Sequence, residues 1–237
     1  MTLILNLESS TEVCSVSLSK NGEMIDLIEN TDGQNHARLL SVFADQLMKN
    51  NHLRFNQLSA VSVSKGPGSY TGLRIGVSLA KGICYANQAP LISISPLRAM
   101  SSFITSNREK YHINTHDDML FCPMIDARRM EVYTALFDQQ NRKIEAVSAK
   151  VIDNNSFNNY LEKHQIVFFG NGSTKCRAEL KHPNAIFIDD IKTSAQFMCS
   201  LAQEAFKNKQ FEDVAYFEPF YLKDFIAGTP KKNILKQ

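Results

Sequence analysis

Apolar and polar positions in the first third of the chain predict three consecutive strands and then a helix. Residues 3–7 form an apolar run typical of a buried strand. Residues 13–18 alternate apolar and polar side chains, residues 21–22 are an Asn-Gly turn signal, and a third strand is expected near residues 24–28. The period then changes, because the apolar side chains of residues 36–48 fall on one helical stripe. We therefore expect an amphipathic helix there.

The pattern continues with two further strands, each followed by a helix. Residues 58–63 return to strand character, and a Gly-Pro-Gly turn at 66–68 leads into a helix over residues 71–85. A short strand at 91–94 and a helix at 96–107 follow. This order of strands and helices calls for a mixed sheet with helices packed against it, and it is similar to one ribonuclease H-like half.

A polar segment, residues 106–118, is the candidate boundary, because the pattern partly restarts after it. The second set of predicted elements comprises strands at 119–125, 132–137, 147–152 and 166–169 and helices at 157–163, 174–180 and 194–207. We therefore predict an α/β fold of two ribonuclease H-like subdomains, residues 1–107 and 108–237, each with a mixed sheet and flanking helices. Two such halves make the architecture of the actin-like ATPase superfamily (ASKHA).

Composition narrows the class of protein further. The 237 residues are 43% hydrophobic, which suits a globular protein, and the formal charge is only +2, too small to favour a stand-alone RNA binder. The first residues lack the basic leader of a signal peptide, so we expect a cytoplasmic protein with no membrane segment. The five cysteines are scattered and indicate neither a disulfide framework nor a zinc site.

The most informative stretch is residues 66–76, which read GPGSYTGLRIG between a strand and a helix. It is neither the dinucleotide-binding fingerprint nor a P-loop. A tight strand-to-helix turn is therefore the favoured interpretation. The alternative is an anion or nucleotide site in which backbone amides cradle a phosphate. The residues of that alternative site would be Glu8, Ser9, Ser10, Gly66, Gly68 and Asp126.

As a string, this stretch resembles the signature G-P-G-S-F-T-G-L-R-I-G of the TsaB family, also called YeaZ, with Tyr70 where phenylalanine is usual. The resemblance extends over nearly the whole chain. It includes residues 4–11 (ILNLESST), 14–18 (CSVSL), 126–133 (DARRMEVY), 170–172 (GNG) and 220–223 (FYLK).

The resemblance implies a non-catalytic subunit rather than an enzyme. Members of the family pair with TsaD, act together with TsaE, and support transfer of threonylcarbamoyl to N6 of adenosine 37 in tRNAs that read codons beginning with A. The implied protein has no catalytic residue and no cofactor of its own, although ATP or ADP is a candidate ligand at the interface with TsaD. It would contact tRNA only through the complex.

Two departures from related families bear on chemistry. Nucleotide-hydrolysing relatives carry an aspartate at the first-strand turn, whereas this chain has Glu8, for which a strand-end or helix-cap carboxylate is the favoured interpretation. The TsaD family carries an H-x-x-x-H metal pair on the helix that corresponds to His36–Leu40, and Leu40 cannot bind a metal. His112 and His116 have the same spacing but no helical stripe, so we expect no metal site.

The helix after the glycine turn carries small residues at every fourth position, Gly72, Gly76 and Ala80, flanked by Ile75, Leu79 and Ile83. Such a groove lets a second helix approach closely, although packing within the same chain is the alternative. The resemblance implies pairing through two helices of the first half, with TsaD or with a second copy. The expected interface comprises Leu39, Leu40, Phe43, Leu47, Gly72, Ile75, Gly76, Leu79, Ala80 and Ile83.

Two other functions remain open at this point. The chain could be an independent ATP-dependent kinase or hydrolase of the actin-like fold that uses Glu8, Ser9 and Asp126. It could also bind tRNA directly, for which the candidates are Arg128, Arg129, Lys231, Lys232 and Lys236. The near-neutral charge favours a solvated surface for these cations.

Overall fold

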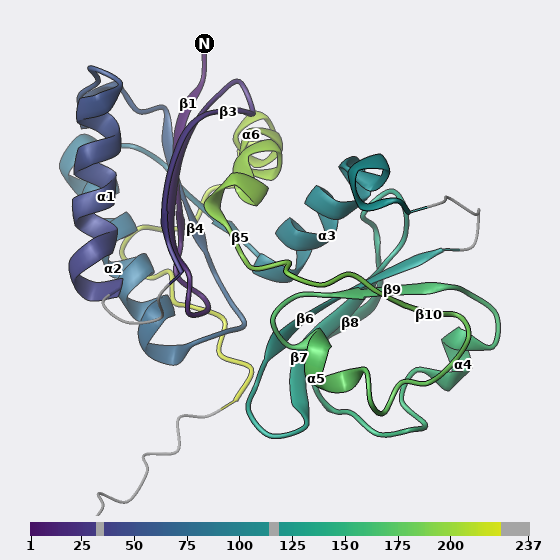
Figure 1. Ribbon diagram of the computed structural model, residues 1–237. Coiled ribbons are helices and arrows are strands. Elements are labelled where there is room, and N and C mark those ends of the chain that lie inside the picture. The colour runs from purple at the N-terminus through teal and green to yellow at the C-terminus, as the bar shows by residue number, and fades with distance from the viewer. Residues whose placement is uncertain (32–35, 114–118, 224–237) are drawn as a thin grey trace, which may run out of the picture.

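The computed structural model describes residues 1–31, 36–113 and 119–223, and it contains two five-stranded mixed sheets (Figure 1). The first sheet has the order β3-β2-β1-β4-β5. Strands β1 to β3 are antiparallel neighbours, while β4 and β5 run parallel to β1. Its strands are β1 (Leu3–Glu8), β2 (Cys14–Lys20), β3 (Glu23–Asn30), β4 (Ala60–Ser64) and β5 (Leu91–Ile94).

The second sheet repeats this plan with the order β10-β9-β6-β7-β8. The antiparallel strands β6 to β8 correspond to β1 to β3, and the parallel strands β9 and β10 correspond to β4 and β5. Its strands are β6 (Leu120–Asp126), β7 (Glu131–Phe137), β8 (Lys143–Val151), β9 (Ile166–Phe169) and β10 (Ala185–Phe187). The repeated strand order confirms the predicted pair of ribonuclease H-like units.

Helices lie on both faces of each sheet (Figure 1). Helices α1 (His36–Asn50) and α2 (Tyr70–Asn87) cover the outer face of the first sheet. Helices α3 (Pro96–Ser106) and α6 (Cys199–Lys207) lie between the sheets, where one apolar core joins the two halves. The short helices α4 (Asn158–Leu161) and α5 (Ser173–Cys176) cover the outer face of the second sheet. Three 3-10 turns complete the fold: η1 (Phe55–Gln57), η2 (Arg108–Tyr111) and η3 (Ala195–Met198).

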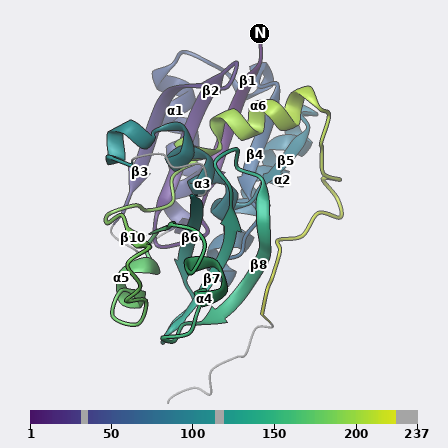
Figure 2. The ribbon, with the colours of Figure 1, turned by 90° about the vertical axis from the view of Figure 1, so that its right-hand side faces the viewer.

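In the layer between the sheets, each sheet is covered by a helix from the other half of the chain. Helix α3 contacts β6 and β7 of the second sheet, although it was expected in the first subdomain. Helix α6 was expected in the second subdomain, but it contacts β1, β2 and β5 and lies across the first sheet (Figure 2). All described strands before residue 107 belong to the first sheet, and all those after it belong to the second. Helices α3 and α6, in contrast, pack on the sheet of the other half. The position of the boundary itself stays a prediction.

Several predicted elements differ in length from those observed. The helix expected over residues 174–180 ends at Cys176, and the segment 194–207 divides into η3 and α6. Strand β10 was not predicted, because a three-residue strand shows no measurable period.

All five cysteines are buried and free, and burial raises the pKa of Cys122 to about 12. Within the described ranges, no helix has both the length and the apolarity that crossing a bilayer requires.

Candidate functional site

A cleft of about 910 Å³ lies between the two halves. On one side it is bounded by the turn after β1 and the N-terminus of α2, and on the other by the turn between β6 and β7. The C-terminal strap, defined here as residues 211–223, contributes its last four residues. The lining consists of Ser10, Thr11, Glu12, Gly68, Ser69, Tyr70, Thr71, Asp126, Ala127, Arg128, Tyr133, Asn171, Phe220, Tyr221, Leu222 and Lys223.

Glu8 caps the end of β1 inside the protein. Its side chain is only 1% exposed. The carboxylate accepts hydrogen bonds from the Ser10 amide at 2.6 Å and from the Ser64 hydroxyl at 2.7 Å. These bonds confirm the interpretation of Glu8 as a strand-end carboxylate. Glu8 is not among the described residues that line the cleft.

The glycine turn is shaped by close packing of backbone on backbone. Gly66 has a φ of +100°, and a Cβ atom there would lie 2.7 Å from the carbonyl oxygen of Phe220. A Cβ at Gly68 would collide with the carbonyl oxygen of Ser10, which accepts a hydrogen bond from the Ser69 amide at 2.6 Å. Only glycine fits at such approaches. The favoured interpretation, a tight strand-to-helix turn, is therefore confirmed.

Three of the candidate anion-site residues meet at the cleft and three do not. Ser10, Gly68 and Asp126 are part of its lining. Ser9 instead donates a hydrogen bond from its hydroxyl to the carbonyl oxygen of Gly72 at 2.8 Å. Like Glu8, Ser9 and Gly66 take part in packing within the chain, so only three of the six candidate residues line the cleft.

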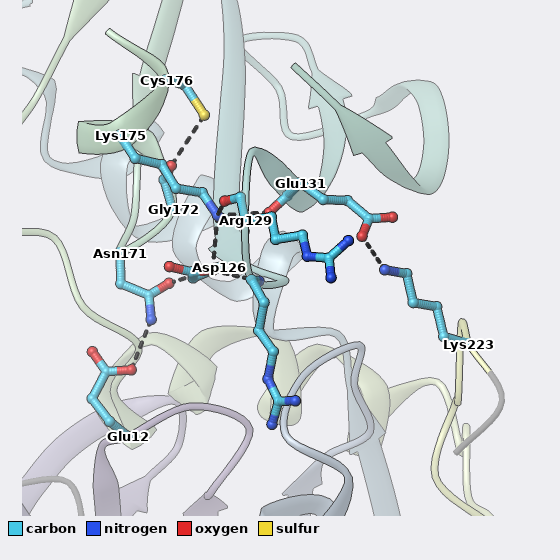
Figure 3. Close-up of polar contacts among 10 residues, drawn as sticks. Glu12, Asp126, Arg129, Glu131, Asn171, Gly172, Lys175, Cys176 and Lys223 are labelled. Carbon is cyan, nitrogen blue, oxygen red and sulfur yellow. Dashed lines mark hydrogen bonds and ion pairs between the residues drawn. The ribbon is translucent and has the colours of Figure 1, made fainter. Parts of the chain in front are cut away.

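The turn between β6 and β7 places Arg128 in the lining of the cleft, with Arg129 next to it in the chain. Arg128 and Arg129 have φ values of +71° and +47°. Asp126 accepts a hydrogen bond from the Arg128 amide at 2.6 Å. Lys175 bonds to the Asp126 carboxylate at 2.8 Å and to the carbonyl oxygens of Arg129 and Glu131 at 2.6 and 2.8 Å (Figure 3). This network holds the turn in a conformation that non-glycine residues adopt rarely.

Polar bridges connect the two halves across the cleft. The Asn171 side chain donates to Glu12 at 2.7 Å and accepts a bond from the Asp126 amide at 3.1 Å (Figure 3). The hydroxyls of Thr11 and Thr193 are 2.6 Å apart. The turn after β1 is thereby joined to the second sheet and to the segment that leads into η3.

The C-terminal strap forms a further connection. The Phe220 amide donates to the carbonyl oxygen of Lys65 at 2.7 Å. Tyr221 packs against Tyr70 with the ring centroids 4.8 Å apart and the ring planes tilted by 40°, and its hydroxyl accepts a hydrogen bond from Arg74 at 3.1 Å. The ammonium group of Lys223 then pairs with Glu131 on β7 (Figure 3). Sequence reasoning missed these contacts, because nothing in the residues 220–223 indicates partners that lie about 90 to 150 positions earlier.

The structure corrects the expected groove on α2. Gly72, Gly76 and Ala80 are buried in the chain itself, and a Cβ at Gly72 or Gly76 would collide with Ser9. On α1, Leu40 and Leu47 are fully buried in the core between helix and sheet. The alternative interpretation, packing within the same chain, therefore holds for these five residues.

The other expected interface residues lie at the margin of that core. Leu39, Phe43, Ile75, Leu79 and Ile83 are half-buried and pack against its edge. Beside the α2 row runs a second set of small residues at four-residue spacing, and all three are exposed. They are Ser78, Gly82 and Ala86. A Cβ added at Gly82 would meet no atom of the described residues within 4 Å.

Most of the remaining histidine and lysine candidates lie outside the described residues. The side chain of His36, residue His116 and the lysines at 231, 232 and 236 lie outside the described residues. His112 is exposed and ends η2 with a φ of +53°. Among the residues that the structure describes, no group of three or more His, Cys, Asp or Glu side chains is arranged to hold a metal ion.

Comparison with known proteins gives consistent matches in sequence and structure. A family model described as "TsaD: tRNA N6-adenosine threonylcarbamoyltransferase" matches residues 28–230. Proteins described as "tRNA threonylcarbamoyladenosine biosynthesis protein TsaB" are similar to this chain. The one from Haemophilus influenzae is 27% identical over 94% of both chains, and the one from Bacillus subtilis is 28% identical over 93% of both. The solved structure "YeaZ from Pseudomonas aeruginosa" shares the fold, with a TM-score of 0.80 at 22% identity over 94% of this chain and 100% of that chain.

Proposed function

This chain belongs to the TsaD family, in its TsaB (YeaZ) branch, and from that premise we propose that it is a partner subunit in tRNA threonylcarbamoyladenosine biosynthesis. In this proposal it docks on a TsaD-type enzyme. The enzyme, together with the TsaE component, transfers threonylcarbamoyl to N6 of adenosine 37 of tRNA. The chain itself contributes a docking surface and no catalytic residue.

The observation that carries the proposal is the glycine at position 82. Glycine inside a helix destabilises it by roughly 0.5–1 kcal/mol relative to alanine. Gly82 lies well within α2, and no other described residue comes within 4 Å of the place where its Cβ would stand. No described residue packs closely enough to require a glycine there. A partner that approaches the helix closely would require one.

The surroundings of Gly82 fit a helix as that partner. Ser78, Gly82 and Ala86 form a shallow strip with little side chain, and the half-buried row Ile75, Leu79 and Ile83 lies directly beside it. Apolar side chains next to a strip of small residues allow two helices to approach and interdigitate. Leu39 and Phe43 of α1 extend the apolar surface toward the neighbouring helix. Two helices from each partner would then form a four-helix contact.

The same surface can serve two partners. A second copy of this chain could present its own α1 and α2 to form a homodimer with an isologous interface. A TsaD-type enzyme with two equivalent helices would compete for the same strip. We propose that the homodimer is the form without the enzyme and that docking of the enzyme replaces it.

Two features support a subunit without chemistry of its own. Glu8, at the position of the aspartate in nucleotide-hydrolysing relatives, is buried and bonded to Ser10 and Ser64. Leu40, at the second metal position of the TsaD pair, is part of the helix–sheet core. The rival, an independent ATP-dependent kinase or hydrolase, would need an accessible carboxylate where Glu8 is enclosed. We propose that ATP or ADP, if it participates, binds at the interface with the TsaD-type enzyme.

The docking surface is tested with Gly82→Leu. The variant should fold normally, because its side chain extends into open space. It should associate with the TsaD-type enzyme at least a hundredfold more weakly, since holding the helices even 1 Å apart forfeits much of the dispersion contact. A matched control is Ser200→Leu, which adds an exposed leucine on α6, between the two sheets and away from the α1–α2 layer. Sedimentation velocity of each variant with the enzyme, together with circular dichroism, provides the measurement.

Two results would count against the proposed surface. Wild-type affinity in folded Gly82→Leu would show that the partner does not contact this strip. An equal loss in Ser200→Leu would show that the effect is not specific to α2.

A further inference from the structure

Arg128, which lines the cleft, and its neighbour Arg129 both occupy an unfavourable backbone conformation. Glycine, asparagine and aspartate adopt positive φ most readily, whereas other side chains do so at a cost. Several other described residues have a positive φ, but Arg128 and Arg129 are the one pair of adjacent non-glycine residues among them. Electrostatic repulsion between the two adjacent guanidinium groups adds to the cost of this backbone conformation. A structural role alone would favour Asn-Gly at these positions.

The carboxylates near the turn are already engaged by other groups. Asp126 pairs with Lys175, and Glu131 pairs with Lys223, as Figure 3 shows. Glu12 accepts its hydrogen bond from Asn171. Within the described part of the chain, no ion pair includes Arg128 or Arg129, and both residues are exposed. Their guanidinium groups are therefore available to an external anion.

Aromatic side chains line the same cleft. Tyr70 and Tyr221 pack against each other with their ring planes tilted by 40°, and the Arg74 guanidinium lies 4.2 Å from the centroid of the Tyr70 ring. Phe220 is 44% exposed beside them, and Tyr133 faces the cleft from β7. Aromatic rings and arginines along one groove are the chemistry that binds single-stranded nucleic acid, because bases stack on the rings and phosphates pair with the guanidinium groups.

We propose that Arg128 and Arg129, together with the aromatic side of the cleft, bind an unpaired stretch of the tRNA substrate while this chain is docked on its catalytic partner. The inference rests on the proposed function and extends it, since it gives the subunit a direct contact with RNA. The formal charge of +2 fits a contact that adds to binding by the complex but is too weak to hold RNA by itself.

The test replaces the pair by residues that suit the turn, Arg128→Asn with Arg129→Gly. An assembled complex of this chain with the TsaD-type enzyme is titrated with an unmodified tRNA transcript over a range of salt concentrations. Each lost contact with single-stranded RNA should reduce the slope of log K against log salt by about 0.7. Two lost contacts predict a slope smaller by about 1.4, which corresponds to roughly 25-fold weaker binding at 0.1 M salt than the wild type and little difference near 1 M. The variant should melt at the same temperature or higher, because its backbone is relieved of strain.

The matched control is Lys163→Asn with Lys181→Asn, which removes two exposed cations from the second half but not from the cleft. It should keep the wild-type slope. Wild-type affinity and slope in the arginine variant would overturn the inference and leave the proposed function intact. Loss of complex assembly in that variant would also overturn it, since the arginines would then bind the protein partner. A wild-type chain that fails to associate with the enzyme would refute the proposed function instead.

Discussion

Gly72 and Gly82 occupy one helix but have opposite surroundings. A Cβ at Gly72 would collide with the backbone oxygen of Ser9, while at Gly82 it would enter open space. We expect Gly72→Ala to lower the free energy of unfolding by about 1–3 kcal/mol, as overpacking does. Gly82→Ala should raise it by roughly 0.5–1 kcal/mol, because alanine is the better helix former. Urea titration of both variants provides the measurement, and two equal changes would show that the helix is rotated from the described orientation.

Spacing along the sequence could locate this helix but not its orientation. The row Ile75, Leu79 and Ile83 is half-buried, and small residues occur at four-residue intervals on both sides of it. Its role in an interface stays a prediction. Which side is buried depends on Ser9, which is more than 60 residues away in the chain. Glu8 is a similar case. A carboxylate at the end of a buried strand was predictable, whereas its bond to Ser64 depends on the pairing of β1 with β4.

The docking of η3 and α6 on the first sheet is unusually polar. In β2 the serines at 15, 17 and 19 are at most 1% exposed, although alternation of apolar and polar residues usually marks a strand with one solvated face. Ser17 donates to the carbonyl oxygen of Ala195 at 3.0 Å and accepts from Asn6 at 3.2 Å. The alternation therefore predicted the strand correctly, but it could not show that a helix from the far end of the chain covers the polar face.

This docking gives a paired prediction. Ser17→Ala removes two buried hydrogen bonds, to the Ala195 carbonyl oxygen and from the Asn6 amide, while Asn6 keeps its bond to Ser19. It should therefore lower the free energy of unfolding by about 0.5–1.5 kcal/mol. Ser62→Ala on the same face should be neutral or slightly stabilising, because its buried hydroxyl has no hydrogen-bond partner among the described residues. Thermal unfolding of both variants tests this pair. A loss for Ser62→Ala as large as that for Ser17→Ala would contradict the described contacts.

Each half supplies a helix that packs on the sheet of the other half, α3 on the second sheet and α6 on the first. We therefore predict that the two halves do not fold separately. A fragment of residues 1–107 keeps the whole first sheet but loses η3 and α6, which pack on Ile4 and Ile92. We expect this fragment to unfold without a cooperative transition or to aggregate, because the inner face of its sheet is exposed. Calorimetry and amide proton spectra of the fragment provide the measurement. A sharp melting transition would show that the boundary at residue 107 separates independent domains.

The central claim is that this chain supports the tRNA modification without performing it. The most direct measurement is reconstitution with the TsaD-type enzyme, TsaE and a threonylcarbamoyl donor, followed by quantification of threonylcarbamoyladenosine in tRNA. We predict that no product forms with this chain alone, that little forms with the other components alone, and that product accumulates when all are combined. Product from this chain alone, or full activity without it, would contradict the account.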